Sequence, residues 1–238
     1  MFMRWARRNG RQVLSRRRND FRLGNGSRRA AGPMARFVAR RRHGETMSST
    51  HEDILALFDP QEGVWDDVIG RHFEYLRFYP TSPVVYYNLG FSFAERDQAK
   101  NAEAAFRKAL EFKPDMVEAW INLGGLAYGR ADWAECIRCN EKALAIDAGF
   151  PAARLNIGFA RLMLDETAEA LKLFEAIIEE NPELGPAHYG LAVAHYSLDN
   201  LEAARKHYAI AVSRGVEPEL EFSKKLTTTH APEVGAKS

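Results

Sequence analysis

Residues 83–116 read PVVYYNLGFSFAERDQAKNAEAAFRKALEFKPDM, and the pair Leu89–Gly90 within this stretch returns along the chain. Leu123–Gly124 follows after 34 residues, Ile157–Gly158 after another 34, and Leu191–Ala192 after a third interval of the same length. A fixed period of this size predicts tandem structural repeats, because each copy of the pattern specifies one supersecondary unit. Such units bury their apolar faces only by stacking on their neighbours.

With this frame the chain resembles the tetratricopeptide-repeat (TPR) family. The family pattern has a large residue at position 4, a Leu-Gly-like pair at 7 and 8, a small or aromatic residue at 11, Ala at 20, an aromatic at 24, Ala at 27 and Pro at 32. The unit 83–116 matches every position, with Tyr86, Leu89, Gly90, Phe93, Ala102, Phe106, Ala109 and Pro114. The units 117–150, 151–184 and 185–218 match most positions. Their departures are Cys136, Asn140, Ala148, Arg154, Arg161, Ile177 and Val216.

The resemblance implies an all-α fold, an α-solenoid of helix–turn–helix repeats that forms a right-handed superhelix with a concave groove. The first helix of each unit is called helix A and the second helix B. The pattern has a packing reason. Glycine at position 8 and small residues at 20 and 27 let the helices approach closely, and the aromatic residue at 24 fills the remaining space. A proline at position 32 ends helix B, because it cannot continue the hydrogen-bond ladder.

The stretches on either side of the four units are predicted to cap them, because solenoid ends need covering. Residues 47–82 are expected to form a degenerate N-terminal cap or partial repeat. Its helix B would be Trp65–Phe78 and its helix A the short Asp53–Phe58. At the other end, a capping helix is predicted over 219–227, with its first turn beginning at Glu217.

The capping helix has Leu220, Phe222 and Leu226 on its apolar side, and Pro218 stands in its first turn. The tail 228–238 is predicted to be disordered.

The first 46 residues form a basic, Arg-rich segment that should be disordered when free. Up to Met47 the chain has fourteen Arg and two acids, a balance of +12, whereas the remainder has nineteen bases and thirty acids, a balance of −11. Four interpretations stay open. The segment precedes the true start at Met47, or is an organellar transit peptide. Alternatively it binds nucleic-acid phosphates, or it tethers itself to the acidic body.

Helix-A positions 2, 5, 9, 12 and 13 line the concave surface in TPR proteins, so the resemblance implies a peptide-binding groove here. Their spacing of three and four residues places them on one helical face. The alternative is that some of these side chains only pack one helix A against the next. The apolar groove residues are Tyr87, Phe91, Ile121, Tyr128, Leu155, Phe159, Leu162, Met163, Tyr189, Val193 and Tyr196.

Position 6 is asparagine in three consecutive units, at Asn88, Asn122 and Asn156, and Gly190 breaks the series. An amide both donates and accepts, so a row of amides can hold an extended peptide backbone whatever its side chains. The superhelix of the O-GlcNAc transferase family has a similar asparagine ladder. The alternative is that Asn is simply frequent at this position of the repeat.

No constellation typical of catalysis appears, and no cofactor or metal is expected. Cys136 and Cys139 form a CxxC, but it falls inside a predicted helix B, where it indicates a small packing residue and a surface thiol rather than a redox site. There is no run of about 18 apolar residues. With only two cysteines in 238 residues, we expect an intracellular, cytoplasmic protein.

The predicted function is therefore that of a non-enzymatic scaffold or adaptor that binds a peptide or helix of another protein. Tyr87 and Phe91 stand where the carboxylate clamp of chaperone-binding TPR domains has Lys and Asn. That difference and the acidic body favour a basic or apolar partner over an acidic one. The alternatives are an assembly chaperone that shields an apolar client segment, and a nucleic-acid-associated protein that uses residues 1–46.

Overall fold

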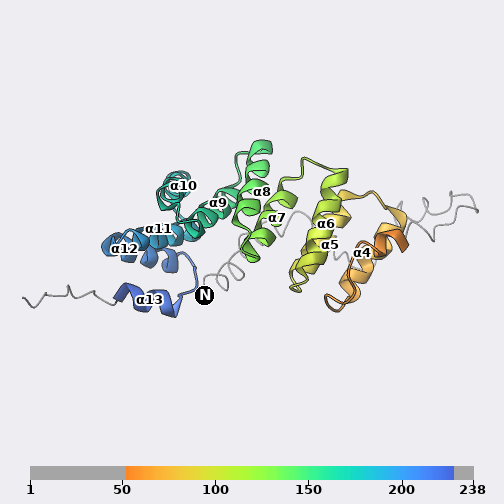
Figure 1. Cartoon of the computed structure of the whole chain (residues 1–238), viewed down its shortest axis with the longest axis horizontal. Helices are drawn as coiled ribbons and strands as arrows, with labels where there is room; N and C mark the ends of the chain where they lie inside the picture. Colours follow the sequence, from red (N-terminus) through yellow and green to blue (C-terminus); the bar gives the residue numbers. More distant parts are fainter. Residues whose placement is uncertain (1–51, 228–238) are drawn as a thin grey trace, which may run out of the picture. The chain divides into compact units, whose positions relative to one another are not determined.

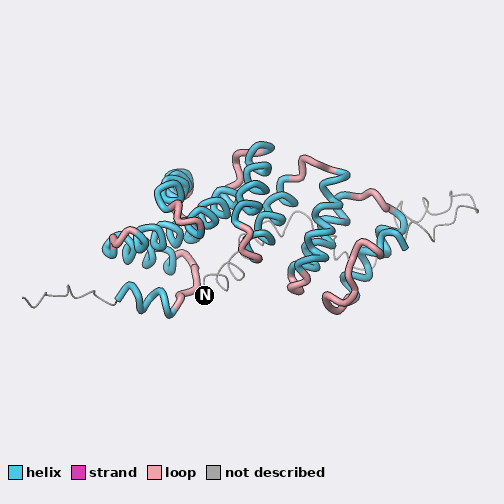
Figure 2. Tube along the Cα trace, viewed as in Figure 1, coloured by secondary structure: helices cyan, strands magenta, loops and turns pink. Residues whose placement is uncertain are grey.

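The computed structural model describes residues 52–227, and the expected arm (1–46) and tail (228–238) lie outside them. The described part consists of helices joined by short loops (Figure 2). The chain divides after Ala119 into two compact units, which are described separately. No helix within 52–227 is both long enough and apolar enough to cross a membrane.

The helices are labelled in Figure 1. Up to Ala119 they are α4 (Asp67–Phe78), α5 (Pro83–Ala94) and α6 (Ala99–Phe112). The boundary falls inside α7 (Val117–Gly129). The helices after it are α8 (Trp133–Ile146), α9 (Pro151–Met163), α10 (Thr167–Glu180), α11 (Gly185–Ser197), α12 (Leu201–Ser213) and α13 (Leu220–Thr227). In α5 to α12, successive first helices begin 34 residues apart, and so do successive second helices. The described part has the all-α repeat fold that the sequence predicts.

Each helix pair turns at a residue with left-handed backbone geometry, and these residues also recur every 34 positions. They are Asp97, Ala131, Asp165 and Asp199, with φ between 56° and 63°. In each turn the N–H of the next residue donates to the carbonyl five residues back, as Gln98 does to Phe93 and Asp132 to Ala127, both at 3.0 Å. This bond satisfies a carbonyl that the end of helix A would otherwise leave open.

The close approach of helix B to helix A takes place at the glycines of position 8. A Cβ on Gly90 would lie 2.8 Å from the ring of Phe106, and a Cβ on Gly158 would lie 2.7 Å from the ring of Phe174. In the second pair Asn140 takes the place of the ring and contacts Gly124. Glycine is therefore required at these positions by packing rather than by backbone conformation.

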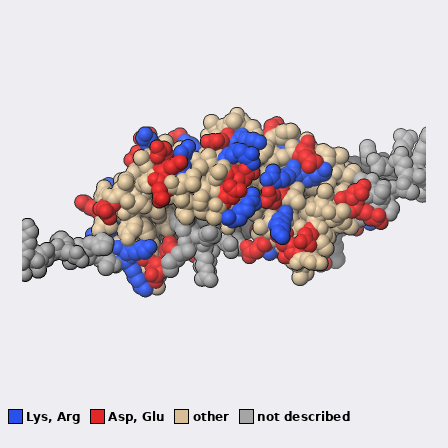
Figure 3. All heavy atoms as spheres, in the orientation of Figure 1, with Lys and Arg blue, Asp and Glu red and all other residues tan. Residues whose placement is uncertain are grey.

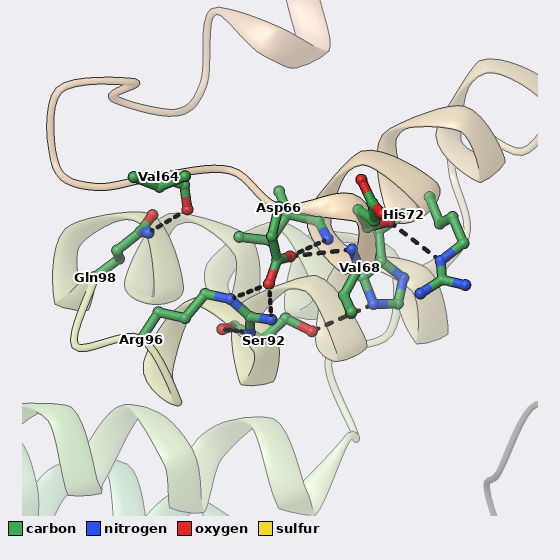
Figure 4. A network of polar contacts seen from close by, with 10 residues as sticks. Val64, Asp66, Val68, His72, Ser92, Arg96 and Gln98 are labelled. Carbon is green, nitrogen blue, oxygen red and sulfur yellow. Dashed lines mark hydrogen bonds and ion pairs between the residues drawn. The ribbon is translucent and has the colours of Figure 1, made fainter.

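The N-terminal cap has no full helix A and is held by the ring of Phe58, which packs on Phe73 and Phe93, and by polar side chains. The carboxylate of Asp66 accepts the N–H groups of Val68 and Ile69 at the start of α4, and it pairs with Arg96 at the end of α5 (Figure 4). Asn101 of α6 accepts from the N–H of Asp59 at 2.7 Å and donates to its carbonyl at 2.8 Å. Side chains thus form the hydrogen bonds to the backbone of the loop before α4, which in a helix the backbone itself would form.

The boundaries differ from expectation at the start of α4. The sequence predicts a helix from Trp65, but α4 begins at Asp67 because the side chain of Asp66 caps it. The prediction of a surface thiol at Cys139 is wrong, since that side chain is only 1% exposed. Cys139 stands three residues after Cys136, so both lie on the same side of α8, and that side faces the core.

The turn geometry predicts a stabilising substitution. Ala131→Gly should raise the free energy of unfolding by about 0.5–1 kcal/mol, because relief of the left-handed strain outweighs the extra entropy of glycine in the unfolded chain. Ala209→Gly, at an exposed position inside α12, should lower it by about 0.5–1 kcal/mol. Thermal melts followed by circular dichroism compare the two. Equal destabilisation by both glycines would contradict the role given to the turn.

Candidate peptide-binding surface

In the unit that ends at Ala119, the predicted site residues lie on α5. Tyr86, Leu89 and Phe93 of this helix are fully buried and form its core face. Tyr87 and Phe91, four residues apart, are half-buried. The ring of Tyr87 lies 5.7 Å from that of Phe106. Asn88, beside them, is also half-buried, so these three side chains remain partly accessible after the core is filled.

In the unit from Trp120 onward, the predicted site residues fall into two groups. Six are buried, namely Ile121, Asn122, Tyr128, Leu155, Phe159 and Tyr189. Five remain accessible: Asn156, Leu162, Val193 and Tyr196 are half-buried, and Met163 is 40% exposed.

The buried group has clear packing partners. The ring of Phe159 lies 5.0 Å from Phe174 and 6.4 Å from Tyr189. Tyr128 packs edge-on against Trp133 at 4.9 Å. Tyr128 thus packs within its own repeat, and Phe159 packs both within its repeat and against the next one through Tyr189. A ligand would reach the accessible group more easily.

The asparagines of position 6 contact the protein interior as well as the helix-A surface. Asn156 donates through Nδ2 to Oδ1 of Asn140 at 3.1 Å, and Asn140 donates to the carbonyl of Cys136 at 2.7 Å. Where the series breaks, a Cβ on Gly190 would lie 2.5 Å from the ring of Phe174. Phe174 therefore excludes a side chain at 190, whereas the smaller Asn140 leaves room for Asn156.

The CxxC cysteines are enclosed within the α8 packing surface. Burial, with a smaller contribution from the nearby Cys139, raises the pKa of the Cys136 thiol to about 12. Cys139 donates to Oε1 of Glu135 at 3.4 Å. A thiol with so high a pKa carries little thiolate, the form that reacts and binds metals. In residues 52–227 no group of three or more His, Cys, Asp or Glu side chains is arranged to hold a metal ion.

At the C-terminal end, two predicted site residues contact α13. The ring of Phe222 packs edge-on against Tyr189 at 5.8 Å and against Tyr196 at 5.5 Å. The hydroxyl of Tyr189 donates to Oε2 of Glu219 at 2.6 Å, and burial raises the pKa of Tyr189. The sequence predicts the apolar side of the capping helix, but it does not predict which residues this side contacts. The participation of Glu219 has no signal in the sequence.

A histidine cluster lies where α11 and α12 meet. Nε2 of His188 is 3.0 Å from the carbonyl of Pro182, and its Nδ1 is 3.1 Å from Nδ1 of His207. The ring of His195 stacks on that of His207 with centroids 5.6 Å apart. Burial lowers the pKa of His207 to about 4, and His188, His195 and Lys206 add to the shift.

The surface charge is acidic on balance but mixed in arrangement. Residues 52–227 contain eighteen Lys or Arg and twenty-nine Asp or Glu. On the face seen in Figure 3, blue basic side chains lie among red acidic ones. Many of these are paired, as Arg154 is with Glu180 and Arg161 with Glu166. On this face the acidic side chains are therefore mixed with basic ones rather than gathered in a single patch.

Comparisons with known proteins agree with the repeat fold. One family model described as a tetratricopeptide repeat matches residues 83–116, and another matches residues 162–219. The chain is 27% identical over 112 residues to the Protein CTR9 homolog of Arabidopsis thaliana. This match covers 47% of this chain and 10% of that protein. It is 28% identical over 99 residues to the BBSome complex member BBS4 of Mus musculus, which covers 42% of this chain and 19% of that protein.

The chain thus spans between about a tenth and a fifth of the length of these two relatives. Among solved structures it is similar to MamA from Desulfovibrio magneticus RS-1, with 17% identity and a TM-score of 0.57. That match covers 78% of this chain and 97% of the MamA chain. At this level of identity the likeness shows the fold alone.

The histidine cluster predicts a pH-dependent stability. Because the pKa of His207 is lower in the folded chain than its ordinary value of 6.5, the unfolded chain binds more protons between about pH 4 and 6.5. Stability should therefore fall as the pH drops through this window, with up to about one proton taken up on unfolding. Urea unfolding at several pH values should show a shallower slope for His207→Gln. Identical slopes would contradict the assignment.

Proposed function

Since this chain is a tetratricopeptide-repeat protein, we propose that it is a scaffold or adaptor that holds a peptide or helix of a partner protein on its helix-A faces. Tetratricopeptide repeats generally mediate contacts between proteins. BBS4, one of its relatives, is by name a member of a protein complex. No enzymatic step is part of this proposal.

The observation that supports the proposal is the apolar surface left over on helix A once the core is complete. On α5 the core uses Tyr86, Leu89 and Phe93, and yet Tyr87 and Phe91 on the neighbouring face are also aromatic. A helix that served only packing would have polar residues there, because exposed large apolar side chains gain nothing from water. Rigid aromatic rings are suited to anchoring a ligand.

The unit from Trp120 onward, taken by itself, has the same kind of surface. Among its predicted site residues, the apolar side chains that stay accessible are Leu162 and Met163 of α9 and Val193 and Tyr196 of α11. Methionine adapts its shape to different ligand surfaces, which suits a binding site. We propose that these side chains form the principal contacts of this unit, and that Tyr87 and Phe91 form those of the unit that ends at Ala119. The six buried residues support them from beneath.

The partner segment is proposed to be basic or apolar. The surplus of Asp and Glu in residues 52–227 disfavours an acidic ligand by long-range repulsion. The amides of Asn88 and Asn156 are proposed to bind backbone groups of the ligand. Because the Nδ2 of Asn156 already donates to Asn140, its carbonyl oxygen is the group proposed for the ligand. The arm 1–46 lies outside the described residues and has no part in this binding mode.

A matched pair of charge substitutions tests the proposal. Met163 on helix A and Ile146 on helix B have similar exposure, 40% and 43%. Affinity purification with cross-linking and mass spectrometry on the wild-type chain identifies the partner. Met163→Glu should then weaken its binding at least tenfold, because Met163 is proposed to contact an apolar residue of the ligand, against which a carboxylate would be buried without a partner. Ile146→Glu should leave binding unchanged.

A second pair applies the same comparison to the other unit. Phe91→Ala should reduce partner capture, and Phe112→Ala, an exposed ring at the end of α6, should not. Circular dichroism must show that all four variants keep their helix content. If folded Met163→Glu and Phe91→Ala chains capture the partner as well as the wild type does, the proposed surface is wrong.

A further inference from the structure

The helix α13 packs against α11, the helix A of the fourth repeat. It lies beside α11 and α12 in Figure 1 and contacts both. Its apolar contacts come from Phe222 and Leu226, which are four residues apart and both buried. Leu220 of the same helix is 67% exposed, so one narrow face of α13 makes the contact.

The surface beneath α13 contacts the ring of Phe222 and also backbone groups at both ends of the helix, the N–H of Glu219 and the carbonyl of Leu226. Three tyrosine rings, Tyr189, Tyr196 and Tyr208, surround Phe222 in edge-on contacts with centroids 5.3–5.8 Å apart. The hydroxyl of Tyr208 accepts the N–H of Glu219 at 2.8 Å, just before the helix begins. These three tyrosines and Arg205 are called the tyrosine seat.

Polar anchors hold the two ends of the bound helix. Arg205 donates through Nε to the carbonyl of Leu226 at 2.6 Å, at the end where helix carbonyls lack partners. At the beginning, the carboxylate of Glu219 accepts from Tyr189 at 2.6 Å. The seat therefore recognises a short helix with an acid before its first turn, an aromatic three residues later and an aliphatic four residues after that.

An apolar cover alone would not need these anchors. The Tyr189 hydroxyl is in a side chain only 1% exposed, so an acceptor must be present for it whenever the site is closed. A site that combines aromatic walls with donors aimed at a carboxylate and a helix carboxyl end has the properties of a ligand site. An eight-residue helix is unstable by itself in water, so α13 is helical only while the seat binds it.

We propose that the tyrosine seat is a helix-binding site, which α13 fills within the chain and which a partner helix of the pattern Glu-x-x-Phe-x-x-x-Leu fills in its place. This inference rests on the proposed scaffold function and extends it to a specific ligand class. The tether to α12 gives α13 a local concentration in the millimolar range. The partner helix must therefore bind more tightly than α13 does, or bind after α13 has been released.

The test uses the chain's own helix as the probe. A synthetic peptide of residues 217–227 is labelled with a fluorophore and kept helical by a lactam between Glu221 and Lys225. It is titrated onto the full-length chain and onto the full-length double variant Phe222→Ala, Leu226→Ala, with fluorescence anisotropy as the readout. The variant should bind the peptide at least tenfold more tightly than the wild type, because its own α13 no longer occupies the seat.

Two controls make the result specific. A full-length chain with Leu220→Ala and Lys224→Ala, both at exposed positions of α13, should behave as the wild type. Peptides with Phe222→Ala or Glu219→Gln should lose at least tenfold in affinity for the double variant. Equal peptide binding by the wild type and the double variant would overturn the inference, and so would no binding by a double variant with intact helix content.

If circular dichroism shows that the double variant loses helix content beyond α13, the single variant Leu226→Ala takes its place with the same expected order of affinities. The outcome separates the two proposals. Failure of the peptide to bind while Met163→Glu still loses the cross-linked partner would reject the seat and keep the scaffold function. Binding of the peptide without any partner that depends on Met163 or Phe91 would reject the scaffold surface and keep the seat.

Discussion

The contact on which the fold depends is the one between the side chain at position 24 of helix B and the glycine at position 8 of helix A. Phe174 lies so close to Gly158 that any Cβ there would collide with its ring, and Phe106 and Gly90 repeat the arrangement. Because the ring replaces the missing side chain, the two helices pack at short distance without leaving a void. The two helices of a pair are thus closely packed, while the remaining apolar face of the pair is buried only by its neighbours.

The same contact limits what the next repeat can place at position 6. Phe174 also reaches Gly190, and it therefore excludes an asparagine there. Asn140 is smaller, and it hydrogen-bonds Asn156 instead of displacing it. The glycine at 190 thus fits the placement of the Phe174 ring, whereas Asn122 follows Phe106 at the same interval, so the residue type at position 24 does not alone decide position 6. The asparagines at position 6 that are proposed to bind a ligand must therefore also fit the side chain at position 24 of the preceding repeat.

Periodicity predicts those features that one repeat determines by itself. The 34-residue interval, the helix pairs and the close approach at Gly90 and Gly158 all follow from a pattern local to each unit. The burial of Phe159 and Tyr189 does not, because it depends on which side chains the neighbouring unit brings against them. The burial of Cys139 differs in this respect, because its spacing of three residues from Cys136 already places both thiols on the same side of α8.

Both ends of the described part are closed by an aromatic ring, Phe58 at the N-terminal end and Phe222 at the C-terminal end. The two ends differ in their polar contacts, and this difference bears on which end can exchange ligands. At the N-terminal end, Asn101 and Asp66 bond to backbone groups of a connected loop, and Arg96 adds an ion pair. These bonds depend on the exact course of that loop, so a foreign peptide could not easily reproduce them. At the C-terminal end, the tyrosines surround one ring and one carboxylate of a short helix. Any helix with the same two side chains at the same spacing could make these contacts, so the C-terminal end is the better suited to exchange.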